Sequence, residues 1–101
     1  MTKPNVTCIV YDKKGNVLSV GRNSYVKTHP LQAQAAKAVG MEKRIYLHAE
    51  IHALVQIEDW KRAFRIEVLR FGSDGKPLNA KPCPICAYVI AKTGIKEVIH
   101  T

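Results

Sequence analysis

Two short segments of the chain contain residue types that bind metals and transfer protons. One is His48-Ala49-Glu50, and the other is Pro82-Cys83-Pro84-Ile85-Cys86. An imidazole and two thiolates together provide three zinc ligands and leave a fourth coordination position open. The two segments therefore predict a zinc site in which His48, Cys83 and Cys86 hold the metal.

The spacing of the two cysteines suits the first turn of a helix. Cys83 and Cys86 are three positions apart, so on a helical turn they share one face. A helix amino end carries partial positive charge, which favours the thiolate form that binds metal. Pro84 fits such a turn because its missing N–H would have no helical partner there. We therefore expect a helix to begin at the second segment.

Glu50 follows His48 by two positions and should project from the same first turn of a helix. Zinc can lower the pKa of a coordinated water to about 7. A carboxylate beside that water can accept its proton and pass it on. We therefore expect Glu50 to be the catalytic residue of an open, hydrolytic zinc site.

Two other interpretations of these residues remain open at this point. A Cys-x-x-Cys pair can be a redox centre, although the neighbouring His-x-Glu gives no support to that reading. A closed structural zinc site is the stronger rival, because His52 lies four residues after His48 on the same helical face. A closed site would leave Glu50 without a role and would make the chain a zinc-stapled binding module.

The elements that must position these residues follow from hydrophobic periodicity and turn signals. Strands are predicted at residues 6–11, 17–21, 65–71 and 96–100, and helices at 31–39, 47–60 and 84–94. Alternation of strand, helix and strand in the second half predicts a parallel pair. The expected fold class is α/β, with a mixed sheet of about four strands. One strand separates the two metal segments, so both metal-binding helices should lie on one face and start at the same end.

Composition limits the class of protein. The chain has 101 residues, of which 47% are hydrophobic and 24% charged, and this is globular composition within one domain, residues 1–101. It contains neither a membrane-length apolar run nor a signal-peptide pattern, so we expect a cytoplasmic protein. A count of three cysteines makes a disulfide framework improbable. The net charge of +8 favours anionic partners such as nucleotides or nucleic acid, although a solvated basic surface explains it equally well.

At the level of motifs the chain resembles the cytidine/deoxycytidylate deaminase superfamily, the zinc-dependent nucleobase deaminases. His48-Ala49-Glu50 and Pro82-Cys83-Pro84-Ile85-Cys86 match its two core motifs, H-x-E and P-C-x-x-C. Val20-Gly21-Arg22-Asn23 resembles the Gly-x-Asn that follows the second strand in that superfamily. The resemblance implies a minimal deaminase core over roughly residues 6–100.

The resemblance implies hydrolytic deamination, most simply of cytosine to uracil in a free (deoxy)cytidine nucleoside or nucleotide. The alternative substrate is a base in single-stranded DNA or RNA, which the basic charge would suit. Asn23 is the expected substrate contact. Arg22 and Lys27 could hold a phosphate, and solvated surface charge is the plainer reading of both.

The chain also departs from the superfamily pattern. It has five residues before the first strand where a helix is usual, and it ends without the customary further helix and strand. The segment Pro30 to Gly40 is not a general feature of the superfamily. Asn79 stands at a position where some branches of the superfamily have a residue with a hydroxyl group. Because open sheet edges and uncovered apolar faces favour self-association, we expect a homo-oligomer.

Overall fold

A computed structural model of the chain describes residues 5–43 and 46–101. The elements follow one another in the predicted order. They are β1 (Asn5–Tyr11), β2 (Val17–Arg22), α1 (Pro30–Ala38), α2 (Ala49–Val55), the 3-10 helix η1 (Trp60–Arg62), β3 (Arg65–Phe71), α3 (Pro84–Thr93) and β4 (Glu97–His100).

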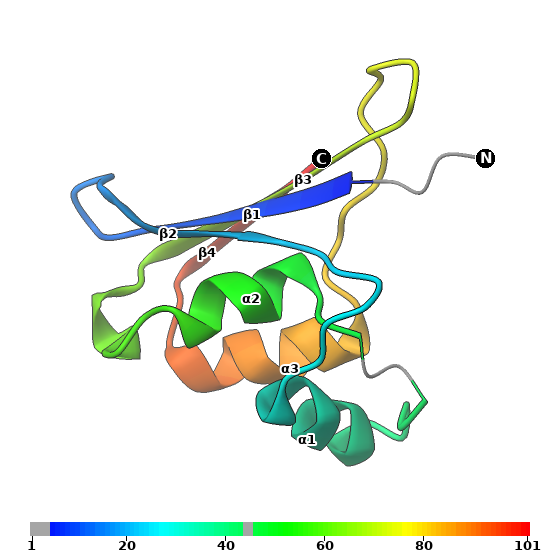
Figure 1. The fold of residues 1–101 in the computed structure, drawn as a ribbon. Coiled ribbons are helices and arrows are strands. Elements are labelled where there is room, and N and C mark those ends of the chain that lie inside the picture. The colour runs from blue at the N-terminus through cyan, green and yellow to red at the C-terminus, as the bar shows by residue number, and fades with distance from the viewer. Residues whose placement is uncertain (1–4, 44–45) are drawn as a thin grey trace.

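The four strands form one mixed sheet in the order β2-β1-β3-β4. β1 pairs antiparallel with both β2 and β3, and β3 pairs parallel with β4, as the strand–helix–strand alternation predicts. The helices lie together on one face of this sheet (Figure 1). The expected mixed α/β sheet with both metal-segment helices on one face is therefore confirmed.

The core lies between that face and the helices. Alternate residues of the two central strands are buried, which is the period-2 pattern of a sheet with one covered face. They are Cys8 and Val10 on β1 and Ile66 and Val68 on β3. Ile51 and Leu54 of α2 and Ile85 and Val89 of α3 are fully buried against them. α1 packs against α3 rather than against the sheet.

Gly21 allows α2 to lie directly on β2. A Cβ atom at position 21 would overlap the carbonyl oxygen of Ala49 and the backbone nitrogen of Ala53, so the helix backbone occupies the space of a side chain. The Ser19 hydroxyl donates to the Ala53 carbonyl oxygen at 2.8 Å from the same strand. This contact sets the position of α2, and with it the position of His48 and Glu50.

A side chain of α2 and that of Gln56, the residue that caps its carboxyl end, also cover the outer edge of β2. The backbone N–H of Arg22 donates to Nδ1 of His52 at 3.0 Å, and Nε2 of Gln56 donates to the carbonyl oxygen of Val20 at 2.8 Å. Edge-strand backbone groups need such partners or water. The edge that the sequence leaves open is therefore partly paired by the helix beside it.

The predicted helix over residues 47–60 is too long. α2 ends at Val55, and Glu58 lies outside it. The carbonyl oxygen of Leu54 accepts from Ile57 N–H at 3.2 Å and from the indole nitrogen of Trp60 at 2.9 Å. These bonds close the last turn, so the chain leaves the helix and reaches β3 through the 3-10 helix.

The face of the sheet opposite the helices bears exposed apolar side chains. By alternation along their strands, Val20 and Phe71 point to this face, and each is more than two-fifths exposed. This exposure is compatible with the expected homo-oligomer, which stays a prediction. In the described part of the chain no helix is long and apolar enough to cross a membrane.

Replacing Gly21 by Ala tests the docking of α2 on β2. The added methyl group has backbone atoms on its path, so the helix must shift, and we expect the free energy of unfolding to fall by at least about 2 kcal/mol. Urea denaturation measures it. Gly72→Ala is the control, because its nearest obstacle is a movable Asp74 side-chain oxygen at 3.0 Å. Equal stability of the two variants would contradict this account of the contact.

Candidate metal centre and its cavity

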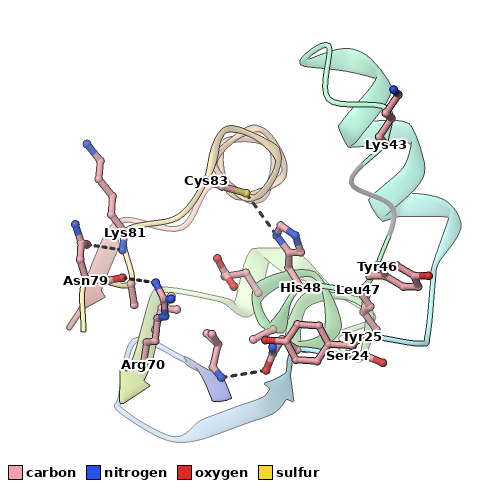
Figure 2. A pocket seen from close by; sticks show the side chains of 16 residues that line it. Ser24, Tyr25, Lys43, Tyr46, Leu47, His48, Arg70, Asn79, Lys81 and Cys83 are labelled. Atoms are coloured by element: carbon pink, nitrogen blue, oxygen red, sulfur yellow. Dashed lines mark hydrogen bonds between the residues drawn. The ribbon is translucent and has the colours of Figure 1, made fainter. Parts of the chain in front are cut away.

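The amino ends of α2 and α3 meet at one end of the sheet. His48 is the residue that caps α2, Cys83 caps α3, and Cys86 lies in the first turn of α3. Figure 2 shows Cys83 and His48 facing each other from these two helix ends. Within the described residues, these three form the group of side chains that could hold a metal ion.

The distances within this group suit zinc. Nδ1 of His48 lies 3.3 Å from Sγ of Cys86 and 3.4 Å from Sγ of Cys83. All three ligand atoms lie within 4.8 Å of one another. A tetrahedral zinc ion with Zn–N and Zn–S bonds of about 2.0 and 2.3 Å places such atoms roughly 3.6 Å apart. The residues therefore fit the metal that their types predict.

The thiol groups of the two cysteines differ in pKa. A hydrogen bond from Cys86 lowers the pKa of Cys83 to about 4, and the neighbouring His48 contributes in the same direction. The same bond, together with burial, raises the pKa of Cys86. Cys83 is thus held as a thiolate near neutral pH, which is the form that a metal ion binds.

Glu50 lies in the first turn of α2 and is 6% exposed. Burial raises the pKa of its carboxyl group, while a hydrogen bond to its own backbone N–H and one to Cys86 act against this rise. Glu50 lines the same cavity as His48 and Cys83. A carboxyl group whose proton affinity is raised and which borders a cavity is suited to accepting and returning protons.

Gln32 of α1 supports His48 from behind. The Gln32 side chain is fully buried, and its Oε1 accepts a hydrogen bond from the backbone N–H of His48 at 3.2 Å. No pattern in the sequence predicts this role of Gln32. A glutamine within an alanine-rich helix gives no periodic signal that separates a buried partner from a solvated one, and Gln34 two positions later is exposed.

The metal group opens into a cavity of about 550 Å³. Apart from the metal segment, its wall comes mainly from the loop after β2 and from the end of β3 with the chain that follows it. The lining residues are Val6, Asn23, Ser24, Tyr25, Lys43, Tyr46, Leu47, His48, Ala49, Glu50, Val68, Arg70, Asn79, Ala80, Lys81 and Cys83. Figure 2 shows Tyr25 and Tyr46 on one side and Arg70, Asn79 and Lys81 on the other.

The loop after β2 is fixed beside the metal segment. Ser24 N–H donates to the carbonyl oxygen of Leu47 at 2.8 Å, and Leu47 N–H donates to that of Lys27 at 2.9 Å. Oδ1 of Asn23 accepts from Val6 N–H at 3.0 Å, which orients its amide against β1. Asn23 therefore borders the cavity in a fixed position, and its contact with substrate stays a prediction.

Arg22 and Lys27 are not among the residues that line the cavity, and both are exposed. Their suggested phosphate contact stays a prediction without support from this geometry. Three other cations do line it, namely Lys43, Arg70 and Lys81. The alternation of β3 held a signal for one of them, because Arg70 falls on the same face as the buried Ile66 and Val68.

His52 does not join the metal group. Its Nδ1 accepts the backbone N–H of Arg22 at 3.0 Å, and the described cluster contains three side chains without it. The third cysteine, Cys8, is fully buried on β1, and burial raises the pKa of its thiol. The geometry thus favours a three-ligand group over the closed site with His52.

Comparison with protein families identifies a match over the whole chain. A family model described as "Cytidine and deoxycytidylate deaminase zinc-binding region" matches residues 1–101. No curated protein matches the chain. The matched residues include both segments that form the metal group.

Removing either sulfur ligand should remove the metal. Purified protein should contain about one zinc per chain, and Cys83→Ala and Cys86→Ala should each lose most of it, because two ligands cannot hold the ion in the same way. Inductively coupled plasma mass spectrometry gives the zinc content. Cys8→Ala is the matched control and should keep full occupancy. Full zinc in either ligand variant would contradict the assignment.

Gln32→Leu tests the support behind His48. Leucine fills a similar volume but leaves the part-buried N–H of His48 without its acceptor. We expect zinc affinity to fall roughly ten- to a hundredfold, the usual effect of losing a group that orients a metal ligand. Competition with a chelator measures the affinity. Gln34→Leu on the exposed face of the same helix is the control, and an equal change in both variants would exclude this role.

Proposed function

Because the chain belongs to the family of the cytidine and deoxycytidylate deaminase zinc-binding region, we propose that it is a hydrolase that deaminates a nucleobase. The proposed reaction converts cytosine to uracil in a free (deoxy)cytidine nucleoside or nucleotide. Zinc is the proposed cofactor, with His48, Cys83 and Cys86 as ligands.

The observation that carries this proposal is the position of Glu50. Its buried carboxyl group borders the cavity beside His48 and Cys83, which belong to the metal group. A purely structural zinc site gives no reason for a buried acid in the wall of a cavity. An acid–base residue for a hydrolytic reaction has to be there, within reach of both water and substrate.

When bound, zinc supplies a Lewis acid that brings the pKa of a water molecule in the site toward neutrality. Glu50 accepts a proton from that water molecule while the oxygen of the water bonds to the ring carbon that bears the amine. Glu50 then delivers the proton to the ring nitrogen. A second proton passes through Glu50 to the amine, the C–N bond breaks, ammonia leaves and a carbonyl remains.

Burial of Glu50 suits both halves of this sequence. Because burial raises its pKa, the carboxyl group holds a proton more readily than a solvated glutamate does. It must nevertheless accept the first proton as a carboxylate, and its hydrogen bonds stabilise that form. These opposing influences are those expected of a group that accepts and donates protons in turn.

The substrate assignment is supported by the volume and the lining residues of the cavity. A volume of about 550 Å³ is within the range of pockets for small ligands. Tyr25 and Tyr46 give aromatic surface on which a base can stack. Asn23, fixed by Val6, can both donate and accept hydrogen bonds and is the proposed contact for the sugar or the base edge.

A base in single-stranded nucleic acid is the second candidate. Tyr25 and Tyr46 are 42% and 51% exposed, so they are open to a longer ligand as well as to a monomer. Aromatic stacking beside cationic side chains is the usual binding mode for single strands. Binding of a polymer releases many counterions. Activity on a polymer would therefore fall steeply as the salt concentration rises, whereas activity on a monomer would not.

Glu50→Gln separates an enzyme from a zinc-binding module. Glutamine keeps the size of the side chain but cannot accept the proton, so zinc content and melting temperature should stay near those of the parent chain. Turnover should fall at least about a hundredfold, the low end for acid–base catalysis. Ammonia release is the readout, with cytidine, deoxycytidine, their monophosphates, adenosine and single-stranded oligonucleotides as substrates.

Glu58→Gln is the control, since Glu58 is exposed and lies after the end of α2. It should keep full activity. Two results would contradict the proposed function: undiminished turnover in Glu50→Gln, or no ammonia from any substrate with zinc fully loaded.

A further inference from the structure

Arg70 carries a positive charge that its surroundings compensate only weakly. It is half-buried on β3, and its Nε is buried without a hydrogen-bond partner. One guanidinium nitrogen, Nη1, donates to the carbonyl oxygen of Asn79 at 3.4 Å, which is a long bond. Within residues 5–43 and 46–101, no carboxylate pairs with it. A guanidinium group that has lost contacts with water, and has gained only one long hydrogen bond in exchange, is stabilised by an anion.

The described side chains that line the cavity carry more positive than negative charge. They include three cations, Lys43, Arg70 and Lys81, against the carboxyl group of Glu50 and the thiolate of Cys83. A concave surface of this kind attracts anionic ligands and concentrates them.

The wall that carries Arg70 and Lys81 is held in place rather than loose. Oδ1 of Asn79 accepts the N–H of Lys81 at 2.9 Å, which fixes the turn between them. Ala80 N–H donates to the carbonyl oxygen of Thr101 at 2.9 Å, and the Thr101 hydroxyl donates to that of Leu78 at 2.6 Å. The two cations therefore stand on a fixed segment that runs from the end of β3 to the metal ligand Cys83.

We propose that Arg70, assisted by Lys81, forms a subsite for a phosphate group of the substrate at the β3 side of the cavity. The inference deepens the proposed deaminase function and rests on it. It makes a phosphorylated nucleoside, rather than the free nucleoside, the preferred substrate class. It also transfers to Arg70 the phosphate role that the sequence suggested for Arg22 and Lys27.

The guanidinium group is suited to this role. Arginine presents several N–H donors in a planar fork that matches two phosphate oxygens. Nη1 of Arg70, which makes only one long hydrogen bond, is a donor that a phosphate can take. The stacking side chains Tyr25 and Tyr46 lie on the opposite side of the cavity from Arg70 (Figure 2). A base stacked there would leave its sugar and phosphate free to extend across the cavity.

Steady-state kinetics with matched substrates tests the subsite. For Arg70→Gln we expect kcat/KM for a cytidine 5′-monophosphate to fall roughly ten- to a hundredfold, chiefly through KM, the usual effect of losing a charged hydrogen bond. The value for the nucleoside should stay within about twofold of that of the parent chain. Arg70→Lys keeps the charge without the fork and should fall between the two.

Arg62→Gln is the control, because Arg62 is an exposed arginine on the 3-10 helix and does not line the cavity. It should leave both substrates unchanged. If Arg70→Gln reduces nucleoside and nucleotide equally, or behaves as Arg62→Gln does, the phosphate subsite is excluded.

Binding of inorganic phosphate, titrated by calorimetry into the zinc-loaded protein, separates the subsite from the reaction. The parent chain should bind phosphate at least about tenfold more tightly than Arg70→Gln. This difference with no ammonia from any substrate would sink the deaminase function and keep the subsite. Equal phosphate affinity would overturn the subsite whatever the activity. Activity confined to oligonucleotides, and reduced by Arg70→Gln, would place the phosphate in a polymer backbone.

Discussion

The close approach of two helix amino ends is the constraint on which the rest of this structure depends. The imidazole of His48 and the sulfur atoms of Cys83 and Cys86 come within bonding range of one ion. This meeting requires both helices to begin at the same end of the sheet. β3 between them and the parallel pairing of β3 with β4 produce that arrangement. The position of each helix along the sheet then matters as much as the direction in which the helix runs.

Three contacts fix those positions. Gly21 lets the backbone of α2 settle on β2, Ser19 bonds to the carbonyl of Ala53, and Gln32 holds the N–H of His48. None of these residues touches the reacting atoms. Each nevertheless limits where the imidazole can lie, and a ligand displaced by one ångström cannot share an ion with two sulfurs. Because Gln32 lies on α1, this helix helps to position the metal ligand His48.

Much of the fold and the centre of the site could be predicted from the sequence. Strands, helix order and parallel pairing follow from period and connection rules, and the two metal segments are specific in residue type and spacing. The length of α2 could not be predicted, because it ends where the Trp60 indole bonds to the carbonyl of Leu54. His52 carries an equal ligand signal by spacing, and only the fold shows that it pairs with the edge of β2. Such contacts depend on residues distant in the chain.

The cavity combines two electrostatic environments. At the metal group, the thiolate of Cys83 and the buried acid Glu50 favour a cation, and on the β3 side Arg70 and Lys81 favour an anion. A ligand with a polar base and a charged tail would match both ends at once. Loop residues near a motif need not face its cavity, and the exposed Arg22 and Lys27 do not line this one, whereas strand alternation directs Arg70 inward.

X-ray absorption spectroscopy at the zinc edge of the purified protein tests the central claim of an open metal site most directly. The three-ligand arrangement predicts two sulfur neighbours at about 2.3 Å and two nitrogen or oxygen neighbours at about 2.0 Å, of which one is an imidazole. The fourth neighbour should come from solvent and should change when a ligand fills the cavity. A spectrum with two imidazoles, or with fewer than two sulfurs, would contradict the account.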